Sequence, residues 1–185
     1  NLAFTSVRIV DENNQPVAAG QRGEVCIKGP NVMQGYWNRP EATAQAIDEL
    51  GWFHSGDIGY LDEDGFLFIC DRLKDMIITG GENVYPAEVE SALYEHDDIN
   101  EVAIFGIPDE KWGEVVVAAI AMKEGKSLEL ADLRSFASQS LAKYKIPTVL
   151  HIVDELPRNP AGKVPVLRID GKVMAVAMAV NAQHL

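Results

Sequence analysis

A run of charged residues, Asp71-Arg72-Leu73-Lys74-Asp75, divides this 185-residue chain into two parts with different patterns. Before the run, short apolar segments are separated by turn residues, which predicts a set of strands with one short helix beginning at Pro40. After the run, apolar positions at helical spacing alternate with β-rich segments, which predicts a mixed unit. We therefore expect an α+β chain: a β-rich, distorted barrel-like subdomain over residues 1–73, a small α+β domain over 74–169, and an atypical tail over 170–185.

Individual elements follow from local signals. In the first half, the strands are expected at 6–10, 24–28, 58–61 and 65–70. In the second half, a small hairpin is expected around Gly80-Gly81, a helix at Pro86, and a helix capped by Ser127. The remaining β-rich segments of that half are 102–107, 114–122 and 148–153.

Charge and composition exclude several classes of protein. The 28 Asp and Glu residues outnumber the 16 Lys and Arg residues, giving a net charge of −12, which argues against nucleic-acid binding. No apolar run approaches the roughly 20 residues that cross a bilayer, and no basic-then-apolar leader is present, so neither a transmembrane segment nor export is expected. Cys26 and Cys70 lie far apart without metal-ligand spacing, so we predict reduced thiols, a cytoplasmic protein and no metal site.

Three segments carry residues suited to chemistry, although each also has an ordinary structural interpretation. In His54-Ser55-Gly56-Asp57, a carboxylate after a glycine can accept hydrogen bonds from two ribose hydroxyls, or can bond only to the local backbone at a strand start. Gly80-Gly81 can let a ligand lie against the backbone, or can simply form a turn. Lys163, on the loop 157–163, can neutralise charge on a reacting phosphate, or can be an ordinary surface lysine.

Taken together, these segments resemble the adenylate-forming superfamily, which contains acyl- and aryl-CoA synthetases, peptide-synthetase adenylation domains and beetle luciferases. The resemblance rests on the strings 51–57, 71–90 and 157–163, with support from 23–25 and 35–43, and it covers roughly residues 5–164. The junction string, which contains Gly-Gly-Glu-Asn-Val-Tyr-Pro, is most similar to bacterial acyl-CoA ligases of the fatty-acid type.

The resemblance implies an AMP-forming ligase that converts a carboxylic acid, Mg²⁺-ATP and coenzyme A into acyl-CoA, AMP and pyrophosphate through an acyl-adenylate. It implies that Asp57 and Arg72 bind the ribose of the nucleotide, and that Lys74 is the hinge of a mobile C-terminal lid. It also implies that Gly80 and Gly81 line the pantetheine channel and that Lys163 is the catalytic lysine of adenylation.

The same resemblance implies that the phosphate loop and the acid-binding pocket belong to an N-terminal domain upstream of this sequence. We therefore predict that the 185-residue chain alone is inactive. Two alternatives remain open: an adenylation enzyme that loads the pantetheine of a carrier protein, and a non-enzymatic module that keeps the lid fold for binding. The identity of the carboxylic acid and the oligomeric state are not predicted.

Overall fold

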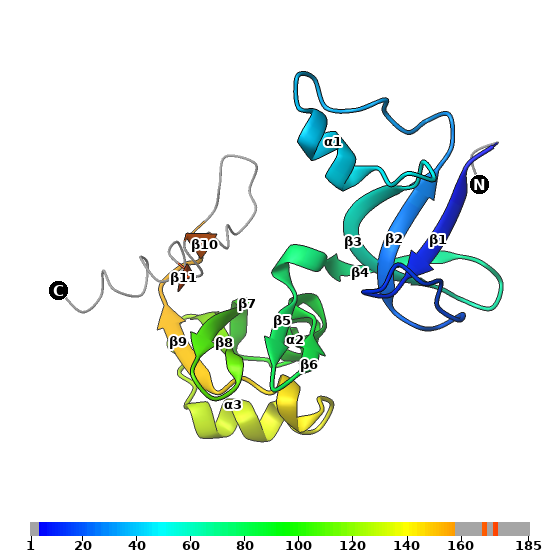
Figure 1. Ribbon diagram of the computed structural model, residues 1–185. Coiled ribbons are helices and arrows are strands. Elements are labelled where there is room, and N and C mark those ends of the chain that lie inside the picture. The colour runs from blue at the N-terminus through cyan, green and yellow to red at the C-terminus, as the bar shows by residue number, and fades with distance from the viewer. Residues whose placement is uncertain (1–3, 158–167, 170–171, 174–185) are drawn as a thin grey trace. The chain divides into compact units, whose positions relative to one another are not determined.

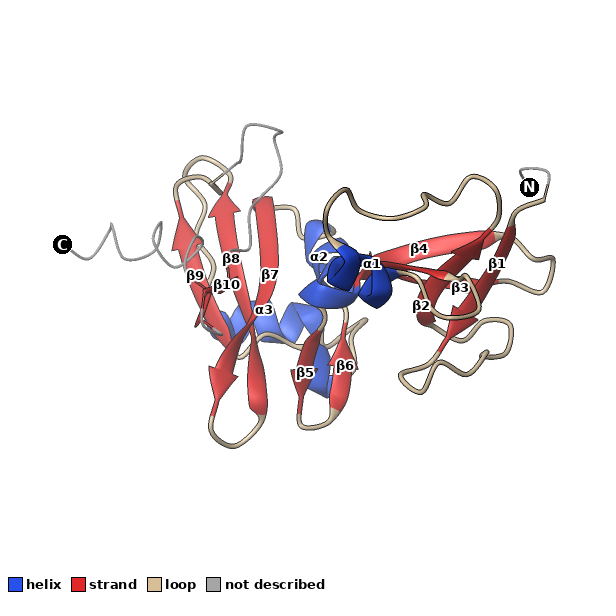
Figure 2. Cartoon of the chain, turned by 45° about the horizontal axis from the view of Figure 1, so that its top comes forward, coloured by secondary structure: helices blue, strands red, loops and turns tan. Residues whose placement is uncertain are grey.

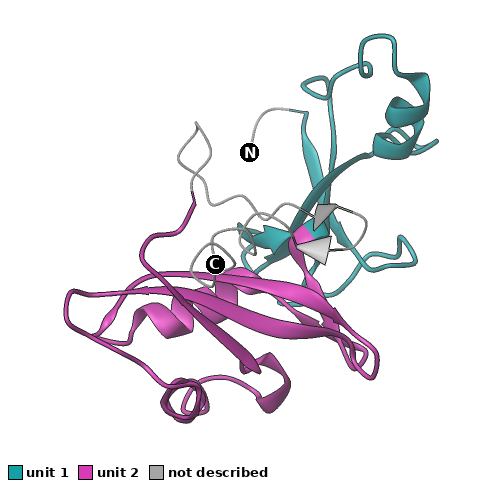
Figure 3. Cartoon of the chain, turned by 90° about the vertical axis from the view of Figure 1, so that its left-hand side faces the viewer, with its two compact units in different colours: residues 1–74 teal, residues 75–185 magenta. Residues whose placement is uncertain are grey.

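The computed structural model describes residues 4–157, 168–169 and 172–173, and side chains are described up to residue 157. The chain forms two compact units, residues 1–74 and residues 75–185 (Figure 3). Each unit has its own sheet, so the fold is α+β as the sequence predicts (Figure 1). The predicted tail over 170–185 lies outside the described residues, apart from Lys172–Val173.

The first unit is built on one antiparallel sheet. Its strands, in spatial order, are β1 (Ser6–Val10), β2 (Gly23–Lys28), β3 (Phe53–Leu61) and β4 (Leu67–Arg72). A single short helix, α1 (Pro40–Ala46), begins at its proline, as predicted. Within the described residues β1 and β4 end the path, so the expected barrel-like subdomain takes the form of an open sheet.

Strand β3 is longer than predicted and irregular on both sides. Its first half pairs with β2, although polar residues and Gly56 gave no strand pattern there. Its register with β2 shifts between Glu24 and Cys26, and its register with β4 shifts between Ile58 and Gly59. Because each shift is a bulge, residues near position 57 face partners that simple alternation would not predict.

The second unit contains a five-stranded mixed sheet. Its members are β5 (Ile77–Thr79), β6 (Glu82–Val84), β7 (Ile99–Asp109), β8 (Gly113–Met122) and β9 (Val149–Val153). The long pair β7–β8 is antiparallel, whereas β9 runs parallel to β8 (Figure 2). A parallel neighbour requires a crossover connection, and α3 (Leu130–Ala137) lies in it. Two short strands, β10 (Arg168–Ile169) and β11 (Lys172–Val173), form a separate hairpin.

The core of this unit has two layers because β7 and β8 carry apolar side chains on both faces of the sheet. Helix α2 (Pro86–Tyr94) buries Val89 and Leu93, and α3 buries Leu133 and Ala137, against one face of the sheet. The opposite face is packed around Phe105, Val117 and Val153, together with Leu156. The continuous apolar run predicted at 114–122 is therefore a strand covered on both sides.

The ends of α3 differ from the prediction. The helix begins after Glu129 and ends at Ala137, whereas the sequence favoured a cap at Ser127 and a helical face that reached Leu141. Leu141 still joins the same core, but from the turn that follows the helix. Among the described residues, none of the helices reaches the length and apolar character that a membrane crossing requires.

Candidate functional site

Asp57 and Arg72, which the sequence assigns to the same ligand, are brought together on neighbouring strands. They are register partners across β3 and β4, and Arg72 Nε lies 3.1 Å from Asp57 Oδ1. The two side chains are 31% and 58% exposed, so a ligand can reach both. An exposed ion pair of this kind contributes about 0–1 kcal/mol to stability, so the pair matters little for folding. It offers carboxylate acceptors and guanidinium donors side by side.

The backbone around Asp57 is held by side chains. Gly56 has a φ of +72° and donates its N–H to Glu24 Oε1 at 3.1 Å. Asp57 donates its own N–H to Ser55 Oγ, also at 3.1 Å. On the other strand, Arg72 donates its N–H to Asp71 Oδ1 at 2.7 Å. Backbone donors released by the bulges are thus satisfied locally.

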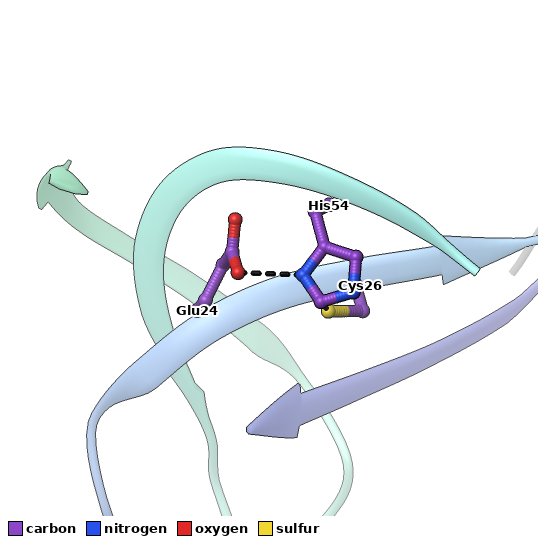
Figure 4. Close-up of side chains that lie close together, drawn as sticks. All are labelled: Glu24, Cys26 and His54. Atoms are coloured by element: carbon purple, nitrogen blue, oxygen red, sulfur yellow. Dashed lines mark hydrogen bonds and ion pairs between the residues drawn. The ribbon is translucent and has the colours of Figure 1, made fainter. Parts of the chain in front are cut away.

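A second cluster, which sequence reasoning missed, lies directly beside this segment (Figure 4). Glu24, Cys26 and His54 place their polar atoms within 4.8 Å of one another. His54 Nδ1 donates to Glu24 Oε2 at 2.7 Å and lies 3.5 Å from Cys26 Sγ. The sequence spacing around Cys26 gives no metal-ligand pattern, but the register pair Cys26–His54 brings a histidine beside it. The sequence did contain one indication of this cluster, because side chains two positions apart in a strand, such as Glu24 and Cys26, lie on the same face.

The charges around this cluster favour a hydrogen-bonded network over a metal centre. Cys26 is fully buried, and burial, together with the charge of Glu24, raises the pKa of its thiol to about 11. The guanidinium of Arg8, which acts on the pKa of the thiol in the opposite sense, ion-pairs with Asp48 at 3.1 Å. A bound cation would meet this fixed positive charge and a thiol that resists deprotonation.

Asp48 anchors the far side of the same network. Its Oδ1 accepts the N–H groups of Leu50 and Trp52 at 3.0 and 2.8 Å, and its Oδ2 lies 3.8 Å from His54 Nε2. Burial alone would raise the pKa of Asp48, but the two backbone bonds, together with Asn14 and Arg8, outweigh it, so the pKa lies below its ordinary value. His54 is therefore placed between two carboxylates, Glu24 and Asp48.

The second unit carries the other predicted site residues, Gly80 and Gly81, at the turn between β5 and β6. Both have positive φ, +59° and +84°, which is the requirement of a two-residue type I′ hairpin. The two glycines differ in their surroundings. A Cβ on Gly80 would lie 3.0 Å from the ring of Trp112, whereas a Cβ on Gly81 would meet no atom within 4 Å.

A pocket of about 690 Å³ lies beside this turn, within the second unit. Gly80 and Trp112 form part of its wall, and Val115, Arg134 and Lys143 contribute apolar and basic groups. Its size falls in the range of small-molecule sites, about 300–1,000 Å³. The Gly80 turn is held against the wall, because Gly80 donates its N–H to the Trp112 carbonyl at 2.8 Å.

Two predicted residues remain. Lys74 lies in a short 3-10 turn, Leu73–Asp75, at the point where the first unit ends. Lys163 lies outside the described residues, so the structure does not place the predicted catalytic lysine. Asp57 and Arg72 belong to the first unit, and Gly80 and Gly81 to the second.

Two family models match this chain, one in each of its two units. The model described as "AMP-binding enzyme" matches residues 1–37, and "AMP-binding enzyme C-terminal domain" matches residues 88–163. The chain belongs to the AMP-binding enzyme family. The resemblance inferred from the three sequence motifs is confirmed.

Individual relatives agree with this assignment. The chain is 55% identical, over 87% of its length, to a 2-succinylbenzoate–CoA ligase of Geobacillus kaustophilus, and 46% identical, over 83%, to a long-chain-fatty-acid–CoA ligase of Bacillus subtilis. It covers 33% and 27% of those proteins, so it spans about a third of the curated relatives it matches. Among solved structures, ATP-bound MatB from Rhodopseudomonas palustris matches 88% of the chain, with 39% identity and a TM-score of 0.82, and 33% of that structure is covered.

Proposed function

We propose that this chain forms the C-terminal third of an AMP-forming acid–CoA ligase. In the first step, a carboxylate oxygen attacks the α-phosphorus of Mg²⁺-ATP, which gives an acyl-adenylate and releases pyrophosphate. In the second step, the thiol of coenzyme A attacks the acyl carbon, the proton leaves the sulfur, and AMP departs. The observation that carries the proposal is the Asp57–Arg72 pair, exposed at a bulge that side chains hold in place.

Asp57 and Arg72 suit the ribose of ATP and of the adenylate. A carboxylate can accept hydrogen bonds from two neighbouring hydroxyls, and only Oδ1 of Asp57 faces Arg72 Nε. Beyond that bond, the Arg72 guanidinium carries two further nitrogens, which can donate to ribose or phosphate oxygens. Arg72 would also keep the Asp57 carboxylate oriented when no nucleotide is bound.

The pocket beside Gly80 is the proposed entry for the thiol substrate. Its apolar wall suits the alkyl amide arm of pantetheine. The wall carries two basic residues, Arg134 and Lys143, which suit phosphates, and two acidic residues, Glu82 and Asp109. Glycine at positions 80 and 81 keeps side chains away from that arm. The alternative acceptor, a carrier-protein pantetheine, has the same arm and differs only in what the arm is attached to.

Lys74 and Lys163 complete the proposal. Lys163 would offset the negative charge that builds at the α-phosphorus during the first step. In the second step, the thiol channel must take the place of Lys163 beside the same carbonyl group. A rotation of the C-terminal lid about Lys74 would exchange the two sets of groups within one active site.

Substrates and surroundings follow from this proposal. The acid is a small-molecule carboxylic acid, whose pocket and whose phosphate loop would lie in the N-terminal domain of the same polypeptide. Mg²⁺ would enter as the partner of ATP, because the chain's acidic excess offers ATP and coenzyme A little electrostatic attraction. The cytoplasm, where both cosubstrates are abundant and Cys26 and Cys70 stay reduced, remains the expected compartment.

Arg72→Ala in the complete ligase tests the nucleotide site. Losing a charge-assisted hydrogen bond should raise the KM for ATP about 10- to 100-fold while leaving the KM for the acid unchanged. Arg39→Ala, an exposed arginine of the first unit, serves as the matched control. An Arg72→Ala enzyme with an unaltered KM for ATP would remove Arg72 from the site.

Lys163→Ala tests the division into two steps. It should abolish adenylate formation but leave thioester formation from preformed acyl-adenylate within about threefold of the unsubstituted enzyme. Lys126→Ala, which changes an exposed lysine of the second unit, should alter neither step. Equal loss of both steps, or no loss in either step, would contradict the role of Lys163.

A further inference from the structure

The segment that carries Asp57 leaves the regular ladder of its sheet. Glu24 pairs with Ile58 and Cys26 pairs with His54, so the three residues 55–57 of β3 lie opposite the single Val25 of β2. Residues in such a bulge lose regular backbone acceptors on the neighbouring strand. Side chains replace those acceptors: Glu24 Oε1 accepts the N–H of Gly56, and Ser55 Oγ accepts the N–H of Asp57.

Gly56 is the residue of the bulge that most needs an external constraint. Its φ of +72° lies in the left-handed region, although a Cβ there would meet nothing within 4 Å. The backbone conformation therefore requires glycine here, and close packing does not. Glycine visits many other conformations at little cost, so its own torsions do not hold it in this one. The 3.1 Å bond from its N–H to Glu24 supplies a constraint.

Glu24 is itself held at both oxygens. Oε1 accepts the N–H of Gly56 at 3.1 Å. Oε2 accepts from His54 Nδ1 at 2.7 Å, as Figure 4 shows. His54 is fixed in turn by the strand pairing with Cys26 and by Asp48, whose Oδ2 lies 3.8 Å from Nε2. A carboxylate oriented by two donors and largely shielded from water is a rigid support for the residue it contacts.

We propose that Glu24 is a positioning residue that fixes Gly56 and thereby aims the Asp57 carboxylate at its ligand. Asp57 follows Gly56 directly and is the register partner of Arg72, so a change at Gly56 moves one member of that pair. Glu24 touches no ligand in this role and acts through Asp57. The catalytic consequence rests on the proposed function, whereas the structural coupling from Glu24 to Gly56 does not.

Amide hydrogen exchange in the 185-residue chain tests the coupling without any assumption about activity. In Glu24→Ala, the Gly56 amide should exchange about tenfold faster, because its acceptor is gone. In Glu24→Gln, the amide oxygen still accepts from Gly56 and its NH₂ can donate to the other tautomer of His54, so the increase should stay below about threefold. Amides of the β1–β2 ladder serve as the folding check, and Glu12→Ala, in the exposed β1–β2 loop, as the matched control.

Kinetics of the complete ligase test the consequence through a double-mutant cycle. Glu24→Ala should raise the KM for ATP about tenfold with kcat nearly unchanged, and Glu24→Gln should restore most of the loss. In an Asp57→Ala background, Glu24→Ala should add less than about twofold, because the residue through which it acts is absent. Additive losses in the cycle would overturn the positioning role.

Amide exchange and kinetics test the Glu24–Gly56 coupling and the proposed nucleotide site separately. An unchanged Gly56 exchange rate in folded Glu24→Ala overturns the inference regardless of kinetics. An Asp57→Ala enzyme with a normal KM for ATP contradicts the proposed nucleotide site, and faster Gly56 exchange in Glu24→Ala would still support the coupling.

Discussion

The turn at Gly80-Gly81 permits a prediction in which two adjacent residues serve as each other's control. Alanine at either position must adopt a positive φ, +59° or +84°, which costs about 1–2 kcal/mol for an L-residue. Replacing glycine also lowers the entropy of the unfolded chain by about 0.4–1 kcal/mol, equally at both positions. The entropy contribution cancels when the variants are compared, whereas the strain does not, because +59° lies in the left-handed region that L-residues can adopt and +84° lies beyond it.

The space around the new methyl group differs as well. At position 80 it would lie 3.0 Å from Cε3 of Trp112 and 3.3 Å from Cζ3, so the ring must shift by a few tenths of an ångström. Overpacking costs about 1–3 kcal/mol, and the low end applies because the Trp112 side chain is half exposed and can move. The contact with Trp112 should therefore cost Gly80→Ala about 1 kcal/mol, and a Trp112→Ala background should remove that cost from Gly80→Ala without changing the effect of Gly81→Ala.

The assay is urea unfolding of the 185-residue chain, followed by amide signals of β7 and β8 so that only the second unit is reported. The complete ligase gives a second readout: Gly80→Ala moves Trp112 at the pocket wall, so it should slow thioester formation more than Gly81→Ala does. A loss of unfolding free energy in Gly80→Ala that is the same with and without the Trp112 side chain would refute the packing argument at Trp112.

Three further predictions concern stability. The pKa of buried Cys26 is raised from 9.0 to about 11, so the contribution of its thiol to the free energy of unfolding is complete below pH 9. That free energy should fall by about 2–3 kcal/mol as the pH rises from 9 through 11. Urea unfolding at a series of pH values should lose this dependence in Cys26→Ala but keep it in Cys70→Ala. The lowered pKa of Asp48 acts in the opposite sense, so acid titrations of unfolding should show stability lost below about pH 4, less steeply in Asp48→Asn. Leu93→Ala, at a fully buried position of α2, should cost about 2–5 kcal/mol by denaturant unfolding, whereas exposed Ser91→Ala should cost under about 0.5 kcal/mol.

Local patterns were sufficient for much of the fold. The proline starts of α1 and α2, the glycine turn at 80–81 and the apolar run of β8 were each read from a few neighbouring residues. The first half of β3 escaped detection because it combines His54, Ser55 and Gly56, none of which favours a strand. Its strand conformation comes from pairing with β2, which is a tertiary effect.

In the candidate site, too, local motifs predict some features, whereas others depend on how the strands pair. The motifs predict Asp57 and Arg72 as site residues, but their direct pairing depends on two bulges whose positions no local pattern reveals. The network of Glu24, Cys26 and His54 joins residues about thirty positions apart. This network can be predicted only when the register between β2 and β3 is known. That register skips two residues of β3, which places His54 opposite Cys26 and frees Gly56 for Glu24.

Acid-dependent exchange between ATP and labelled pyrophosphate tests the central claim most directly, because it reports adenylate formation alone. The complete ligase should catalyse exchange, and the 185-residue chain by itself should not. Asp57→Ala should lower exchange at subsaturating ATP by about a hundredfold, whereas Asp64→Ala, in the exposed turn between β3 and β4, should leave it unchanged. Undiminished exchange in Asp57→Ala, or exchange by the isolated chain, would contradict the account.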